Sequence, residues 1–167
     1  MEDSISSILI LVLLIIMSAY FSATETAYSS LNKIKLKSIA NKGNKKAKLA
    51  LELSEKYDSV ISTILIGNNI VNIATASLAT VLFTKLLGSS GVTVSTIVMT
   101  ILILIFGEIS PKSIAKDIPE SFAIVSAPLL NAFCIILKPV NNLFCLWKKV
   151  ISKVFKIQKH SGITEDE

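Results

Sequence analysis

The sequence contains no arginine, so all 17 of its basic residues are lysines. Proteins that read nucleic acid use arginine for bidentate contacts, and lysines beside hydrophobic runs report membrane topology instead, so we expect no nucleic-acid partner. Histidine occurs once, at His160, and cysteine twice, at Cys134 and Cys145, without metal-ligand spacing. Zinc, copper and haem sites therefore lack their usual ligands, and we expect both thiols to be reduced and packed. No phosphate loop or nucleophile–base pair is present, so we expect no enzyme.

Hydrophobic residues make up 51% of the chain and gather in runs that carry no charge. With their flanks, three runs reach the ~20 residues that a membrane-spanning helix needs. We predict spans at about 5–29, 59–86 and 92–109. The first run is unlike a signal peptide, because Glu2 and Asp3 make its start acidic. We therefore expect one all-α membrane domain over residues 1–157.

Lysines at the ends of the runs predict the orientation of the chain. Segment 31–56 follows the first span and contains seven lysines before its first acidic residue: Lys33, Lys35, Lys37, Lys42, Lys45, Lys46 and Lys48. Positively charged loops stay in the cytoplasm. We therefore expect this segment to be a cytoplasmic helical hairpin in a multi-pass protein of the cell membrane, with the N-terminus outside and the C-terminus inside.

Segment 119–157 has two interpretations. Residues 122–137 are apolar enough for a fourth span, but such a span would export the lysines that follow it. The run is also short, interrupted by Pro128 and closed by Lys138 and Pro139. We expect juxtamembrane amphipathic helices at the cytoplasmic interface, anchored by Trp147, and a fourth span is the alternative.

Two glutamates, Glu25 and Glu108, lie inside the hydrophobic runs. A carboxylate at membrane depth costs several kcal/mol unless it is compensated, and a bound cation is the obvious compensation. Ser18, Ser22 and Glu25 are four and then three residues apart, so they share one face of a helix. The first span therefore carries a polar stripe.

The other two spans supply further oxygen atoms. Asn68, Asn69 and Asn72 fall within five residues, where they are either ligands or groups that hydrogen-bond helices together. Pro111 has no N–H to bond the carbonyl of Gly107, which would leave a backbone oxygen free at a kink or bulge beside the second glutamate. The alternative is a simple proline kink. Hydroxyl, amide, carbonyl and carboxylate oxygens suit hard cations such as Mg²⁺, Ca²⁺ or Na⁺.

Three motifs together resemble the transmembrane domain of the CorC/CNNM family: residues 21–27 (FSATETA), 67–72 (GNNIVN) and 106–112 (FGEISPK). They occur in the family's order and spacing, and the resemblance covers essentially the whole chain. It implies a dimeric magnesium exporter with three spans per protomer, a cytoplasmic helical belt, a Mg²⁺ site enclosed by the spans, and export driven by Na⁺. The metal ligands that it implicates are Ser22, Glu25, Asn69, Asn72, Gly107 and Glu108, followed by Asn68 and Ser18.

Family members usually continue into cytoplasmic CBS domains that bind nucleotide. Residues 158–167 resemble the linker into that module, which would hold any ATP site. We expect a Na⁺-coupled Mg²⁺ exporter, and small residues over 74–80 predict a homodimer packed through the second and third spans. The alternatives are a membrane anchor and dimerisation platform for a regulatory CBS module, without transport, or a transporter of another hard cation.

Overall fold

The computed structural model describes the backbone of residues 2–141 and the side chains of residues 5–141. Every regular element in this part of the chain is helical, so the predicted all-α fold is confirmed. Three helical stretches are long and apolar enough to cross a membrane: Ile5–Ser30, Tyr57–Asp117 and Pro119–Ile136.

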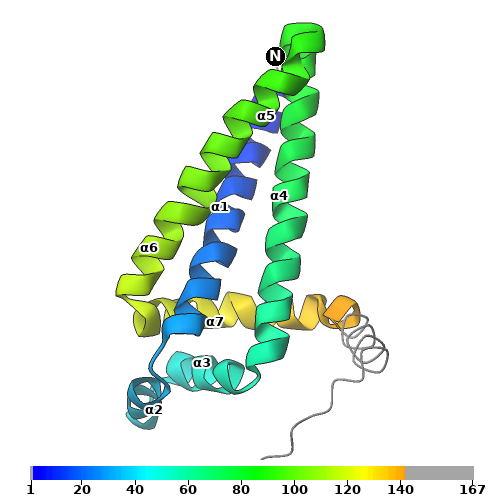
Figure 1. Ribbon diagram of the computed structural model, residues 1–167. Coiled ribbons are helices and arrows are strands. Elements are labelled where there is room, and N and C mark those ends of the chain that lie inside the picture. The colour runs from blue at the N-terminus through cyan, green and yellow to red at the C-terminus, as the bar shows by residue number, and fades with distance from the viewer. Residues whose placement is uncertain (1, 142–167) are drawn as a thin grey trace, which may run out of the picture.

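Three long helical segments, called legs below, form the tall part of the structure in Figure 1. Two of the legs are single helices, α1 (Glu2–Ser30) and α4 (Tyr57–Leu87). After α4 the chain reverses at a 3₁₀ turn, η1 (Gly88–Ser90). The 61-residue apolar stretch that begins at Tyr57 is therefore two antiparallel legs. In Figure 1 these two legs meet at the turn and diverge towards the other end, with α1 between them.

The third leg changes its helical pitch in the middle. It begins as α5 (Gly91–Leu102), continues as a π-helix, η2 (Ile103–Ile109), and ends as α6 (Ser110–Asp117). In the π-helix the N–H of Ser110 bonds the carbonyl of Ile105, five residues back. Pro111 lies in the first turn of α6. The bulge that this proline predicts is present, and its hydrogen bonds span five residues instead of the four of an α-helix, in the segment that contains Glu108.

The basic segment after α1 forms the predicted hairpin of two short helices, α2 (Lys33–Asn41) and α3 (Lys45–Glu55). Asn32 caps α2 by accepting hydrogen bonds from two backbone N–H groups, and Asn44 caps α3 by accepting one. The turn between them contains Gly43 at φ 91°, a left-handed conformation that favours glycine. The sequence therefore determines this hairpin locally.

Helix α7 (Pro119–Ile136) lies across the ends of the legs in Figure 1, beside α3, instead of running along them. This arrangement corresponds to the interfacial interpretation of the segment. The expected interruption at Pro128 was wrong, because α7 is continuous through it. A proline inside a helix removes one backbone hydrogen bond, and Pro128 is on the exposed side. Cys145, Trp147, His160, the predicted second helix beyond residue 141 and the predicted linker lie outside the described residues.

Side-chain hydrogen bonds join the helices of the belt (α2, α3 and α7) to one another and to α1. The Glu120 carboxylate, at the start of α7, accepts from the backbone N–H of Asn32 at 3.1 Å and from Lys35 Nζ at 3.0 Å. The Tyr20 hydroxyl on α1 donates to the backbone carbonyl of Ser126 on α7 at 2.9 Å. Glu120 therefore links the hairpin to α7 by two charge-assisted hydrogen bonds.

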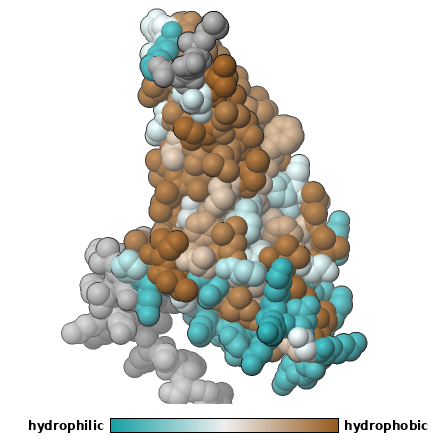
Figure 2. Space-filling view, turned by 180° about the vertical axis from the view of Figure 1, so that it is seen from behind, coloured by the Kyte–Doolittle hydropathy of each residue, from teal (hydrophilic) through white to brown (hydrophobic). Residues whose placement is uncertain are grey.

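The apolar surface covers the legs and the polar surface covers the belt. Figure 2 shows a brown column above a largely teal base. Large hydrophobic side chains point outward along all three legs, as expected of helices that face lipid: examples are Leu13, Ile16, Ile73, Val81, Ile97 and Ile101. Thr75 and Ala79 are fully buried within the protomer, so part of the small-residue stripe expected at a dimer interface packs internally. Ala76 and Ser77 remain exposed.

Candidate cation site between the three legs

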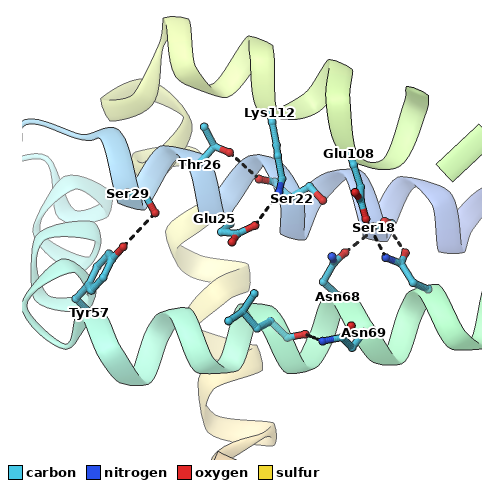
Figure 3. A network of polar contacts seen from close by, with 12 residues as sticks. Ser18, Ser22, Glu25, Thr26, Ser29, Tyr57, Asn68, Asn69, Glu108 and Lys112 are labelled. Carbon is cyan, nitrogen blue, oxygen red and sulfur yellow. Dashed lines mark hydrogen bonds and ion pairs between the residues drawn. The ribbon is translucent and has the colours of Figure 1, made fainter. Parts of the chain in front are cut away.

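A cluster of polar side chains joins the three legs near the middle of α1. The Ser18 hydroxyl donates to Asn72 Oδ1 at 2.7 Å and lies 3.3 Å from Asn68 Oδ1. Asn72 Nδ2 in turn faces Glu108 Oε1 at 3.4 Å. Figure 3 shows the residues of α1, α4 and the third leg converging at this point. The four side chains form one network that no single helix could build.

This network has more oxygen acceptors than donors. A serine hydroxyl carries one proton, and the short contact to Asn72 uses it. The more distant Asn68 Oδ1 is then without a donor from Ser18. The bond from Asn72 to Glu108 is long, which makes it weak. Asn68 Oδ1 and the Glu108 carboxylate are therefore only loosely satisfied by the protein, and a cation would satisfy them better.

Two buried residues next to the cluster, Gly107 and Ser22, also favour a bound ion. Gly107, in the π-helix, is buried against Ser18, and a β-carbon at Gly107 would lie 2.9 Å from the Ser18 hydroxyl oxygen. Ser22, one helical turn along α1, is 1% exposed, and its hydroxyl has no hydrogen-bond partner among the described residues. A buried polar group without a partner costs free energy, and coordination of an ion would remove that cost.

Glu25, the glutamate of α1, forms an ion pair. Glu25 Oε2 lies 3.1 Å from Lys112 Nζ, on the side of the cluster that faces the belt. The Glu25 side chain is 28% exposed and that of Lys112 is 42% exposed. Ion pairs with this much exposure contribute about 1 kcal/mol or less. Glu25 is therefore compensated in this structure by a weakly held lysine.

Asn69 does not join the other predicted ligands. Its side chain is exposed, and its Nδ2 donates to the backbone carbonyl of Leu65 in its own helix at 2.9 Å. In Figure 3 it lies along α4 and does not project towards Ser18 as Asn68 does. Adjacent helix residues point about 100° apart, so a run of asparagines cannot all face one site.

The sequence did not predict the contact made by Lys112, which enters above only as the last residue of the third motif. The available signal was its position four residues after Glu108, on the same helix and one turn nearer to the belt. A sequence cannot show, however, that this lysine faces Glu25, because the π-helix changes which side of the third leg it is on.

The close approach of α1 and α4 below the cluster depends on Gly67. The Phe21 ring packs on this glycine so closely that a β-carbon there would lie 2.5 Å from a ring atom. The ring also packs in a tilted arrangement against the ring of Phe133 of α7, with the ring centroids 4.9 Å apart. The contact brings the two legs together at the depth where Ser18, Ser22 and Asn68 face each other.

The arrangement can bind a hard cation. It offers hydroxyl, amide and carboxylate oxygens from three separate helices, which is the ligand type that Mg²⁺, Ca²⁺ and Na⁺ prefer. Of the predicted ligands, Ser22, Asn68, Asn72, Gly107 and Glu108 lie in or beside the network, together with Ser18. Glu25 lies further along the same stripe of α1, and Asn69 lies outside.

Comparison with known proteins gives the family. Residues 9–167 match the family model described as the cyclin M transmembrane N-terminal domain. The chain is 44% identical over 113 residues to the UPF0053 inner membrane protein YfjD of Escherichia coli, covering 68% of this chain and 26% of that protein. It is 42% identical over 124 residues to a UPF0053 protein of Haemophilus influenzae, covering 74% of this chain and 30% of that protein.

A third relative has a functional name. The chain is 31% identical over 138 residues to the polyamine export protein of Haemophilus influenzae, covering 75% of this chain and 32% of that protein. The chain thus spans about a third or less of the length of these relatives. The resemblance based on the three motifs is confirmed: the chain is a multi-pass membrane protein and belongs to the CorC/CNNM family, as its transmembrane domain.

Proposed function

We propose that the protein is a membrane transporter that exports Mg²⁺ from the cytoplasm. The observation that carries this proposal is the network of loosely satisfied oxygen atoms contributed by all three legs at the middle of α1. Ser22, with a buried hydroxyl that lacks a partner among the described residues, and Gly107, which leaves room for no side chain, support it. Serine and asparagine side chains that only joined helices would not need two carboxylates beside them.

The proposed orientation places the belt in the cytoplasm and the N-terminus of α1 outside. The lysines of α2 and α3 support this orientation, because they lie at the belt end of the legs. Glu25 and Lys112 would then lie between the cytoplasm and the cluster. An ion leaving the cell would pass this pair before it reached Glu108.

Na⁺ coupling and a homodimer belong to the same proposal. A groove between α4 and the third leg is lined by small and hydroxyl-bearing residues that allow close helix packing, together with three large apolar ones: Ala76, Thr80, Ser95, Thr96 and Thr100, with Met99, Ile103 and Leu104. A second protomer could pack there. Na⁺ is a hard cation that accepts the same oxygen ligands, and its inward gradient could drive Mg²⁺ outward.

A flux measurement in liposomes tests the proposal. Purified protein would be reconstituted with a Mg²⁺-sensitive dye, with and without an opposing Na⁺ gradient, and titrated with Mg²⁺ by calorimetry in detergent. Saturable Mg²⁺ binding and Na⁺-dependent flux are the expected results. Binding without flux would overturn transport by this domain, and absence of both would favour the alternative in which the domain is a membrane anchor for a regulatory module.

A polyamine is the second candidate cargo. One observation favours it: Glu25 already binds a primary ammonium group, that of Lys112. The name of the Haemophilus influenzae relative agrees with such a cargo. Polyamines are chains of ammonium groups, so one of them could replace Lys112 at Glu25. Competition calorimetry with spermidine separates the candidates, because a polyamine transporter would bind spermidine more tightly than Mg²⁺.

A further inference from the structure

The ion pair between Lys112 and Glu25 places a tethered cation beside the proposed ion site. Glu25 shares the polar stripe of α1 with Ser18 and Ser22, and Lys112 follows Glu108 on the third leg. The two charged atoms are 3.1 Å apart. Each partner of the pair is therefore rigidly linked, through its own helix, to groups of the cluster.

The charge between the legs depends on where this lysine is. With the pair formed, Glu25 and Glu108 carry two negative charges and Lys112 one positive charge, which leaves a net charge of −1. One monovalent cation neutralises that charge, whereas a divalent cation leaves an excess positive charge in a medium of low dielectric constant. With Lys112 moved away, the two carboxylates match a divalent cation.

Lys112 is free enough to move. Its side chain is 42% exposed, and its contact with Glu25 joins one nitrogen to one oxygen. An ammonium on a flexible four-carbon stem lacks the rigid, forked geometry that makes an arginine pair persistent. Exposed pairs of this kind are weak, so a divalent ion bound between the legs, which repels the ammonium group and attracts both carboxylates, can displace the lysine.

We infer that Lys112 is the resident counter-ion of Glu25, and that its position sets whether the site is charge-matched to a monovalent or a divalent cation. This inference rests on the proposed function. When Lys112 is paired with Glu25, the charge of the site suits Na⁺ or the return of the transporter without a bound ion. When Lys112 has moved away, the charge of the site suits Mg²⁺. Lys112 is thus a specificity-determining residue that touches the ligand Glu25, and it is not itself a ligand.

Calorimetric titration with Mg²⁺ tests this role. Lys112→Met removes the competing charge at similar volume, and we expect Mg²⁺ to bind about fivefold more tightly than in the wild type. Lys112→Arg keeps the ion pair and should bind Mg²⁺ no more tightly than the wild type does. Lys116→Met is the matched control: Lys116 lies one turn further along α6, is exposed and has no ion pair among the described residues. Its Mg²⁺ affinity should stay within twofold.

Acylation of lysines by an amine-reactive reagent, followed by mass spectrometry, gives a readout that does not depend on affinity. Mg²⁺ should increase the labelling of Lys112 in the wild type, and NaCl at the same ionic strength should not. Glu25→Gln should give the higher labelling without any Mg²⁺. These measurements need only wild-type protein and a near-isosteric variant, so they decide the matter even if Lys112→Met does not fold.

Each outcome separates the two proposals. If wild-type protein binds Mg²⁺ but Lys112→Met binds it with equal or lower affinity, or if Mg²⁺ leaves the labelling of Lys112 unchanged, the role of Lys112 is overturned and the proposed function stands. If neither the wild type nor Lys112→Met binds Mg²⁺, the proposed function falls and this inference falls with it.

Discussion

The two glutamates between the legs have contrasting surroundings. Glu108 faces the neutral amide of Asn72 across a long hydrogen bond and has no ion pair among the described residues. Glu25, further along the polar stripe of α1, has a lysine at 3.1 Å. The first carboxylate therefore keeps a charge that is available to a cation, whereas the second has its charge already neutralised. Under the proposed function, we therefore expect Glu108 to dominate ion affinity and Glu25 to adjust it.

Substitution of each glutamate in turn tests this contrast. Glu108→Gln should weaken Mg²⁺ binding about 100-fold, because it removes a charged ligand whose interactions are worth ~3 kcal/mol. Glu25→Gln should weaken binding by about tenfold or less, since ion binding must first break the Lys112 pair. Calorimetry measures both affinities. Glu52→Gln, an exposed position on α3, is the control for loss of one charge. Equal losses at the two glutamates would contradict the contrast.

The next largest effect concerns two asparagines three residues apart on α4. Asn72 accepts the hydrogen bond of Ser18 inside the cluster, whereas Asn69 is exposed and bonds its own helix. Asn72→Ala should weaken Mg²⁺ binding by about tenfold or more, because it removes a ligand oxygen that the other legs cannot replace. Asn69→Ala should change affinity less than twofold and serves as the matched control. If the two variants behave alike, Asn72 only holds the helices together.

Replacing Pro111 should change the stability of the protein and its Mg²⁺ affinity in opposite directions. Pro111→Ala restores a backbone N–H after the π-helix, so the third leg should become more regular and gain up to ~3 kcal/mol of stability. The same change should alter the helical phase of the third leg, turn Glu108 away from Asn72 and lower Mg²⁺ affinity. Melting temperature in EDTA and calorimetric affinity measure the two effects separately.

Pro128→Ala is the control for this change, because Pro128 also lies inside a helix but is exposed and distant from the cluster. It should raise stability and leave Mg²⁺ affinity unchanged. Unchanged affinity in Pro111→Ala would show that the π-helix is a packing feature.

The smallest effect on the site is expected from the belt. Glu120→Gln weakens the charge-assisted bonds to Lys35 and to the Asn32 N–H, and should lower stability by ~1 kcal/mol. Lys35→Met should give a similar loss, and the double variant should lose less than the sum, because both remove the same interaction. Thermal denaturation measures these values. A change in Mg²⁺ affinity would show that the belt and the site are coupled.

The parts of the structure that depend on local chemistry were predictable from the sequence. The hairpin follows from Asn32, Gly43 and Asn44, which act within a few residues of themselves. The bulge in the third leg follows from Pro111, which lacks a hydrogen-bond donor. The polar stripe on α1 follows from helical spacing alone, and the structure places Ser18 and Ser22 in buried positions facing the other legs.

The parts that depend on how helices rotate against each other were not predictable. Asn68, Asn69 and Asn72 have the same chemistry, and only the packing of α4 on α1 decides which of them face inward. The ion pair of Glu25 with Lys112 depends on the phase of the third leg after its π-helix. Thr75 and Ala79 were assigned to a partner because small size alone does not show which neighbour uses the space.

The hydrogen bond from Tyr20 to α7 couples rotation of α1 to movement of α7. Tyr20 lies two residues from both Ser18 and Ser22, so it points roughly 200° away from each of them around the helix axis. Its hydroxyl is attached to the Ser126 carbonyl, and its ring packs against Phe133. A displacement of α7 therefore applies a torque to α1, and rotation of α1 moves both serines relative to Asn72 and Glu108. Force applied at the belt would therefore reach the proposed ion ligands through the opposite face of a single helix.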